Sequence, residues 1–424
     1  MKPATLPLRT LPNTTHYEWA GRTLKRLFRS KQAISETWAF FSGPQQPARL
    51  AGPGADGLTM KDLVTRTPEV LGPAGVDPKN HNQKYFFVKF LDPSDFPAFA
   101  YVGFRPDTAG QLGPARLRRR LAELLWEDRL AVEALAEQLR PRVKSRAAFA
   151  RIKSAYKRWA IEQARRNWRG RAPANGAMKR QQAARRQIVD LMHRIEFEDD
   201  QAILIETPTL HAIAGLSLQL HPKTPDNFFP KDELWIYKKI PLPGGSRGWI
   251  LVEPQRTFDK TESGGDFFTP FAWEGGDRTG RLGFRKRITR AYLQKFVALM
   301  DATAHPASHY VRRAAKMTIA GATTTGRAHW YRLVEERGWP YFLVRELRFT
   351  GAGRSETPLS HRSFIELHVT QGEVRVWLGT RGRTRKHFTV SPTQPAFLPA
   401  SLPDSTITYQ ASRPAQLQFF TRSP

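Results

Sequence analysis

Alternation of apolar and polar residues between Ile203 and Phe271 is the feature that most constrains the fold of this chain. In a β-strand, residues i and i+2 project from the same face, so a period of two indicates strands with one buried side. Gln219 and His221 of the run LSLQLHP are therefore expected on one face. A lone His or Glu in a strand is usually a satisfied polar group, so this spacing gains weight only from its neighbours.

Two further side chains extend this pair into a candidate metal site. One is a histidine a short turn before the pair, and the other is the glutamate of the run KDELW that follows it. Two neutral imidazoles, an amide oxygen and a carboxylate form a plausible zinc-binding set with room for a substrate. The predicted ligands of one zinc ion per chain are His211, Gln219, His221 and Glu233.

Length and composition favour a globular protein with more than one domain. The chain has 424 residues, of which 40% are hydrophobic, enough for two or three domains with real cores. It has no cysteine, which excludes disulfides, thiolate zinc sites and thiol nucleophiles. The sequence shows neither an apolar signal region at its start nor a run of about 18 apolar residues, so a cytoplasmic protein without membrane spans is expected.

The chain carries a formal net charge of +29, which attracts anions without choosing among them. A phosphorylated sugar, a nucleic acid and an anionic membrane surface all fit this charge. Much of the excess is local, because the segment from Pro114 to Asp190 contains 21 Lys and Arg against 7 Asp and Glu. This basic segment therefore accounts for 14 of the 29 charges.

The same segment changes from strand period to helical period, with leucines and a valine recurring at steps of three and four. Pro141 is expected to end the first helix, and two more helices are predicted over Arg146 to Asn167 and Met178 to His193. The apolar positions of the first helix are Leu117, Leu121, Leu124, Leu125, Val132, Leu135 and Leu139.

Two interpretations of the basic helices stay open. Arginine and lysine are good helix formers that cover apolar surface with their stems, so a solvated helical face is the simpler interpretation. The alternative is a surface that binds RNA, DNA or another polyanion, because Tyr156, Trp159 and Trp168 are interspersed with the basic residues and could stack on bases. The segment contains no recognised nucleic-acid-binding motif.

The rest of the chain has mostly strand character. Residues 1 to 110 are predicted to be β-rich with loops, and from Tyr341 onward short alternating runs and turns indicate strands again. Between these parts, residues 285 to 338 are predicted to be helical and loop structure. His361 and His368 are most simply strand residues, and the C-terminal barrel is expected to bind no metal.

These runs resemble a known family. LSLQLHP followed by KDELW is similar to the LSxQxHP and K-x-E-x-W signatures of type I phosphomannose isomerases, and ILIETPTLHAI is similar to their HAI strand. EPQRTFDKT, ISETWAFFSGP, GLTMKDLVTRTPEVLG and the run from Tyr85 resemble further family patterns. The resemblance implies two cupin barrels, zinc on the four residues proposed above, and an aldose–ketose isomerisation through a cis-enediol. It also implies active-site positions for Lys231 and Glu253.

Three departures from the family pattern leave a second function open. Gly103 and Arg105 stand where the family has its first Gln and His ligands, so the ligand hairpin is predicted to have moved to a place after the HAI strand. Glu262 and Ser263 stand where the family has Tyr and Arg, so Arg256 or Lys260 is the predicted replacement cation. In a regular strand, Arg256 lies on the opposite face from Glu253 and Gln255. The alternatives to an isomerase are a non-catalytic zinc cupin that binds sugar phosphates or polyanions, and another metal-dependent cupin enzyme.

The sequence thus predicts a mainly β fold of two cupin (jelly-roll) barrels with a basic helical insertion. The expected domains are a metal-binding first cupin over 1–111 and 194–284, an insertion over 112–193, a helical linker over 285–340 and a metal-free cupin over 341–424. The expected substrate is a phosphorylated sugar such as mannose 6-phosphate, and nucleic acid is a possible partner of the insertion. The expected catalytic residues are Lys231, Glu253 and Arg256.

Overall fold

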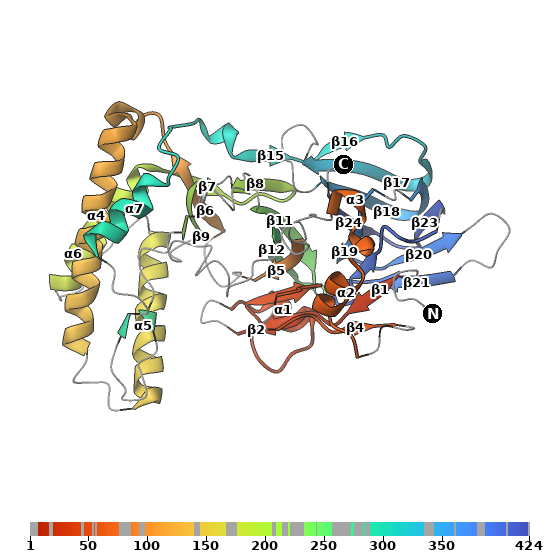
Figure 1. Cartoon of the computed structure of the whole chain (residues 1–424), viewed down its shortest axis with the longest axis horizontal. Helices are drawn as coiled ribbons and strands as arrows, with labels where there is room; N and C mark the ends of the chain where they lie inside the picture. Colours follow the sequence, from red (N-terminus) through yellow and green to blue (C-terminus); the bar gives the residue numbers. More distant parts are fainter. Residues whose placement is uncertain are drawn as a thin grey trace.

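The computed structural model arranges the chain as curled antiparallel sheets with a group of long helices at one end (Figure 1). The predicted fold class, a mainly β cupin-like protein with a helical insertion, is confirmed. The structure describes residues 7–16, 20–43, 46–52, 55, 57–75, 86–92, 98–139, 145–166, 176–205, 209–213, 219–220, 233–242, 244–256, 273–274, 283–284, 289–334, 343–359, 362–379, 386–403 and 406–422.

The described residues of the segment singled out by its alternation lie mainly in a seven-stranded sheet. This sheet separates two hydrophobic cores, because Ile203 and Ile205 enter one core whereas Ala202 and Leu204 enter the other. A strand that is buried on both faces has a continuous apolar sequence, and AILI of β8 is such a run. The strand order is β15 (Val311–Arg313), β8 (Gln201–Ile205), β11 (Glu233–Pro241), β12 (Arg247–Arg256), β5 (Phe86–Leu91), β3 (Glu36–Ala39) and β2 (Asn13–Thr15).

A four-stranded sheet shares the first of these cores. Phe99 and Val102 of the smaller sheet belong to the same buried cluster as Trp235 and Leu251 of the larger one. The two curled sheets therefore enclose a common interior, as expected of a cupin barrel. The order of the smaller sheet is β10 (Gln219–Leu220), β9 (Leu210–Ile213), β6 (Phe99–Phe104) and β7 (Met192–Glu196), and β13 (Trp273–Glu274) pairs separately with β14 (Gly283–Phe284).

The C-terminal strands form an eleven-stranded sheet around a third core, which contains Leu347, Val369, Tyr409 and Leu417. Two N-terminal strands, β1 and β4, extend this sheet at one edge. The main path is β21 (Lys386–Val390), β20 (Val374–Gly379), β23 (Thr406–Ala411), β18 (Leu343–Pro358), β24 (Ala415–Thr421), β19 (Ile365–Gln371), β22 (Ala396–Leu398), β1 (Leu8–Thr10) and β4 (Leu50–Ala51), with β17 (Thr323–Val334) pairing with β18 and β16 (Ala315–Met317).

The predicted helices of the basic insertion are present, with small shifts at their ends. They stand side by side at the end of the molecule away from the C-terminal sheet (Figure 1). Among the described helices, none is both long enough and apolar enough to cross a membrane. The helices are α1 (Thr23–Leu27), α2 (Met60–Arg66), α3 (Gly72–Gly75), α4 (Gly113–Leu139), α5 (Arg146–Arg165), α6 (Gly176–Asp190) and α7 (Arg290–Ala298), with 3₁₀ turns η2 (Pro68–Leu71), η3 (Gly110–Leu112) and η5 (Ala307–His309).

Buried polar contacts hold the insertion helices to one another. Arg185 of α6 donates from Nε to both carboxylate oxygens of Asp128 on α4, at 3.0 and 3.1 Å. Gln182 of α6 donates to Gln163 of α5 at 3.0 Å. Burial raises the pKa of Tyr156 to about 12, so its phenol stays protonated at neutral pH. A set of satisfied buried polar groups favours one mutual arrangement of the three helices.

Two sequence predictions about secondary structure need correction. The third helix ends at Asp190 rather than His193, because residues from Met192 onward pair with β6 as strand β7. The segment 285–338 is helical mainly in α7, and its second half forms β15, β16 and β17. The run TTTGRAHWYRLV contains β-branched and aromatic residues, which suit a strand. Its sequence pattern alone indicates a strand only weakly, and its pairing along β18 decides the structure. The domain boundaries stay a prediction.

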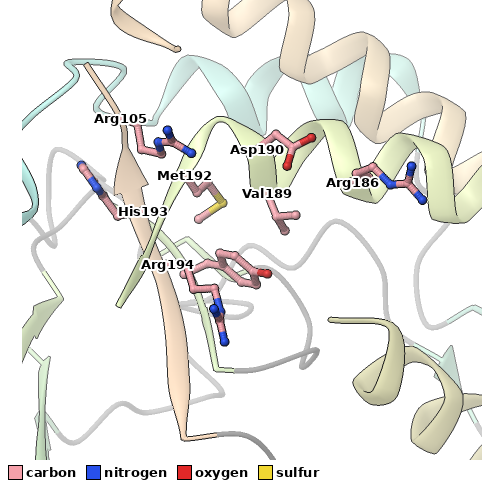
Figure 2. A pocket seen from close by; sticks show the side chains of 8 residues that line it. Arg105, Arg186, Val189, Asp190, Met192, His193 and Arg194 are labelled. Carbon is pink, nitrogen blue, oxygen red and sulfur yellow. The ribbon is translucent and has the colours of Figure 1, made fainter. Parts of the chain in front are cut away.

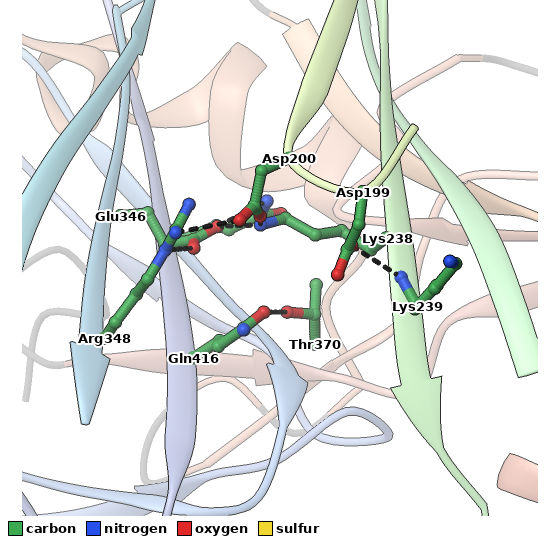
Figure 3. Close-up of polar contacts among 9 residues, drawn as sticks. Asp199, Asp200, Lys238, Lys239, Glu346, Arg348, Thr370 and Gln416 are labelled. Atoms are coloured by element: carbon green, nitrogen blue, oxygen red, sulfur yellow. Dashed lines mark hydrogen bonds and ion pairs between the residues drawn. The ribbon is translucent and has the colours of Figure 1, made fainter. Parts of the chain in front are cut away.

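A charged cluster joins the seven-stranded sheet to the eleven-stranded sheet (Figure 3). Lys238 of β11 lies 2.7 Å from Glu346 of β18, and both side chains are fully buried. Asp200 forms ion pairs with Lys238 and, at 2.8 Å, with Arg348. Gln418 of β24 donates to Glu346 at 3.1 Å, so each charge in the cluster has opposite charges or donors around it.

Candidate functional site

His211 lies at the centre of the four-stranded sheet, inside the first barrel. Its Cα pairs with Val102 of β6 on one side and with Gln219 of β10 on the other. The side chain is 1% exposed, and its Nδ1 lies 3.1 Å from the carbonyl oxygen of Thr209. Because a carbonyl only accepts, Nδ1 carries the proton in this contact and the ring lone pair is on Nε2.

Trp235 connects His211 to a buried carboxylate. The two rings meet edge to face with centroids 5.4 Å apart. Trp235 donates from Nε1 to Oε2 of Glu253 on the adjacent strand β12, at 3.1 Å. The contact brings together two residues that the sequence predicted for the site, one as a ligand and one as an acid/base group. They come from different sheets of the same barrel.

Lys89 of β5 completes this group. It pairs directly with Glu253 across the two strands, and its Nζ donates to Oε1 at 2.7 Å. The ammonium group also lies 5.7 Å from the ring centroid of Trp38 and 5.5 Å from that of Phe87. Apolar and aromatic walls lower the local dielectric and strengthen the charge pair. We call Lys89, His211, Trp235 and Glu253 the barrel cluster.

Two members of the barrel cluster, Lys89 and Trp235, were not predicted from the sequence. Lys89 stands in the strand run FFVKFL, and its single charge among apolar residues was the available signal. Trp235 was only part of the KDELW pattern, although buried tryptophans usually use the indole N–H to hold a polar partner. Neither residue is recognisable as part of a site without the strand pairing that places it beside Glu253.

The remaining predicted site residues are placed only by their backbone or lie outside the described residues. Gln219 opposes His211 in the β9–β10 pair, and Glu233 opposes Gln255 in the β11–β12 pair. Arg256 ends β12 opposite Phe86. The proposed ligand hairpin after the HAI strand therefore has a backbone counterpart in β10. The side chains of Gln219, Glu233 and Arg256, and all of His221 and Lys231, lie outside the described residues.

Gly103 and Arg105, the positions at which the family ligands are replaced, have structural roles of their own. Gly103 has φ +57°, and a Cβ there would lie 2.0 Å from the phenol oxygen of Tyr310. Glycine is required by both the backbone conformation and this close approach. Arg105 follows the end of β6, where its backbone N–H donates to the Leu191 carbonyl and its side chain pairs with Asp107. Gly103 and Arg105 therefore supply no metal ligand at this strand end.

The described residues fit part of a zinc site. A metal-binding imidazole commonly donates its other ring N–H to a backbone carbonyl, and His211 does so toward Thr209. Gln219 occupies the position on β10 whose Cα pairs with that of His211. Among the described residues, no group of three or more His, Asp or Glu side chains converges on one point. The ligand set His211, Gln219, His221 and Glu233 stays a prediction.

The second barrel buries a histidine in a different setting. His368 of β19 is 2% exposed and lies 3.0 Å from the Glu366 carboxylate. Its ring packs against the rings of Phe40, Phe90 and Phe420. Burial lowers the pKa of His368 to about 3, so the imidazole is neutral over the physiological range.

Comparison with known proteins gives a fold but no sequence relative. No family model matches the chain, and no curated protein matches its sequence. Three solved structures of phosphomannose isomerase variants from Salmonella typhimurium are similar to it over 99% of this chain and 100% of theirs. Two histidine-to-alanine variants have TM-scores of 0.54 and 0.52 at 12% and 11% identity, and a lysine-to-alanine variant has 0.52 at 12%. At such identities the likeness shows the fold alone.

Proposed function

We propose that this protein is a metal-dependent aldose–ketose isomerase that interconverts mannose 6-phosphate and fructose 6-phosphate through a cis-enediol. The observation that carries the proposal is the barrel cluster. A buried imidazole, a carboxylate and an ammonium group meet inside the barrel of a fold whose solved examples include phosphomannose isomerases. Titratable groups that converge in a barrel interior are the usual material of acid/base catalysis.

One zinc ion is the proposed cofactor. His211, Gln219, His221 and Glu233 would hold it, with the tautomer of His211 set by the Thr209 carbonyl. When bound, zinc polarises the sugar oxygens on which negative charge develops during enolisation. The substrate phosphate needs a cation, for which Arg256 at the end of β12 is the proposed residue.

Proton transfer is assigned to residues of this chain. Isomerisation removes a proton from carbon 2 of the aldose and returns one to carbon 1, while a hydroxyl proton moves between the two oxygens. Glu253 would accept and return the carbon-bound proton, since Lys89 and Trp235 fix both of its oxygens in place. The ammonium groups of Lys89 and Lys231 would assist the transfer of the hydroxyl proton between the oxygens on carbon 1 and carbon 2.

A second candidate function is a non-catalytic cupin that binds sugar phosphates. The same contacts favour it in one respect, because Glu253 is 4% exposed and both of its oxygens accept hydrogen bonds within the protein. These two contacts occupy lone pairs of the carboxylate that a substrate proton could otherwise use. The replacement of the family arginine by Ser263 also favours a binding module, because it removes an active-site cation.

A coupled assay of the zinc-loaded protein with mannose 6-phosphate separates the two functions. The isomerase proposal expects metal-dependent formation of fructose 6-phosphate that is lost in Glu253→Gln and kept in the matched Glu346→Gln variant. Glutamine keeps the shape of glutamate but cannot accept the proton. Tight binding of mannose 6-phosphate without any turnover would instead identify a binding module.

A further inference from the structure

A second concave site lies where the basic insertion meets the first barrel. A pocket of about 440 Å³ opens between the end of β6, strand β7 and the C-terminal part of α6. Figure 2 shows its three arginines on different elements, with Arg105 just beyond β6, Arg194 on β7 and Arg186 on α6. A pocket of this volume is in the range that holds a small organic ligand.

The walls of this pocket are rich in guanidinium groups. Arg105 pairs with Asp107, and Arg194 lies 2.7 Å from Glu196. Both acidic partners are more than half exposed, at 61% and 57%, so water and salt weaken these pairs. A guanidinium has five N–H donors, and neither pair uses all of them. Arg105 and Arg194 can therefore donate to a second anion as well as to their carboxylate partners.

The pocket has a small apolar floor together with a hydroxyl and an imidazole. Met192 and Val189 form this floor and are almost fully buried, and His193 also lines the pocket. Tyr101 of β6 pairs across the sheet with Arg194 and also lines the pocket. Burial raises the pKa of Tyr101 to about 12, which keeps its phenol a hydrogen-bond donor. Guanidinium groups above an apolar floor suit an anion that is attached to a carbon skeleton.

This pocket is separate from the barrel cluster. Tyr101 pairs with Ala212 of β9, whereas the next residue, Val102, pairs with His211. Successive residues of a strand face opposite sides of the sheet, so Tyr101 and His211 project from opposite faces. The side of the pocket formed by Tyr101 and Arg194 thus lies behind the sheet that carries the candidate active site.

We propose that this pocket is a binding site for a small phosphate ester, distinct from the isomerase site. A phosphoryl group offers three terminal oxygens as acceptors for guanidinium donors, and three arginines on three different elements line this pocket. The net charge of +29 would raise the local concentration of such an anion. Asp190 at the end of α6 also lines the pocket and opposes the anion. This negative charge gives the proposal a test with a defined sign.

The test is calorimetric titration of the full-length protein at low ionic strength with inorganic phosphate and with fructose 6-phosphate. All variants are made in a His211→Ala background, so that binding in the barrel is disabled and failure of the proposed function does not affect the result. Arg105→Gln and Arg194→Gln should each weaken binding by about tenfold, because each removes a charge-assisted hydrogen bond. Arg158→Gln on the exposed face of α5 removes the same charge elsewhere and should change little.

Asp190→Asn supplies the complementary measurement, because it should strengthen binding several-fold, a gain that misfolding does not mimic. Fructose 6-phosphate should bind more tightly than phosphate because the apolar floor contacts its carbon skeleton. The proposal is overturned if the two arginine variants bind like Arg158→Gln, if Asp190→Asn weakens binding, or if phosphate alone binds as tightly as the ester.

Discussion

Two buried lysine–glutamate pairs, one inside the first barrel and one between the sheets, have the same contact distance and different surroundings. Lys89 and Glu253 lie 2.7 Å apart in the barrel, and Lys238 and Glu346 lie 2.7 Å apart between the seven-stranded and eleven-stranded sheets. The second pair is fully buried and is shared with Asp200, Arg348 and Gln418. The first pair keeps some exposure, with the lysine side chain 12% accessible, and it adjoins aromatic rings and an imidazole.

The difference shows how surroundings assign a role to the same chemical pair. A pair that is fully enclosed by further charges and donors is held in one arrangement. Removal of one partner leaves uncompensated charges in an interior without water. A pair at the wall of a barrel, whose lysine is partly accessible, retains groups that a substrate can engage. We therefore assign the Lys238 pair to joining the sheets and the Lys89 pair to the proposed chemistry. The following predictions test this assignment in order of expected effect.

The largest effect is expected from Glu346→Gln. Loss of this charge leaves Lys238 and Arg348 facing fewer counter-charges, so the free energy of unfolding should fall by about 3–5 kcal/mol. Denaturant titration measures it, with the exposed Glu162→Gln on α5 as the control, which should change stability by less than about 0.5 kcal/mol. Turnover per folded molecule should stay at the wild-type value. A fall of less than about 1 kcal/mol in the free energy of unfolding would show that the enclosed pair does not hold the two sheets together.

Glu253→Gln should reduce turnover strongly and stability less, the reverse of Glu346→Gln. We expect turnover to fall by about 100-fold or more, equivalent to about 2.7 kcal/mol, because the amide cannot accept a proton. The free energy of unfolding should fall less than in Glu346→Gln, since Lys89 keeps access to solvent. Steady-state kinetics and denaturant titration on the same preparations measure both effects. A variant that is strongly destabilised but fully active would assign this pair to structure as well.

His211→Ala is expected to act on metal rather than on stability. Wild-type protein should carry about one zinc per chain, since the four proposed ligands form one set. Loss of a partner that merely orients a metal ligand costs about 10–100-fold in affinity, so loss of a ligand should cost at least that. Metal analysis after dialysis against a chelator measures this, with His368→Ala in the second barrel as the control. Equal zinc content in His211→Ala and wild type would remove His211 from the ligand set.

The smallest effect concerns pH and the buried His368. Its folded pKa of about 3 lies below the ordinary value of 6.5, so the unfolded state takes up a proton first as the pH falls. This contribution to stability is complete above about pH 6.5 and is lost progressively toward pH 3, at about 1.4 kcal/mol per unit. Unfolding measured at pH 7.5 and 5.5 should show a smaller difference in His368→Gln than in wild type. The exposed His387→Gln variant should retain the wild-type difference.

Much of the local structure was predictable from the sequence because its cause is local. The leucine spacing that begins at Leu117 predicted the long first helix of the insertion, and Leu117, Leu121, Leu124, Leu125 and Leu135 are buried in the structure. The alternation after Ile203 predicted the strands that carry His211 and Glu253, whereas the role of Glu253 came from the family resemblance of its run. In each case the period of the apolar residues selects helix or strand without reference to distant segments.

The cluster itself was beyond what the sequence could determine, because its members meet through strand pairs between distant segments. Lys89 and Glu253 are 164 positions apart, and their contact exists only because β5 pairs with β12 in one register. The strands that replaced the expected helical linker, and the N-terminal strand β1 that joins the C-terminal sheet, have the same origin. Periodicity specifies which face of a strand is buried. The neighbour of that strand is chosen by the packing of the whole core, which only the tertiary structure decides.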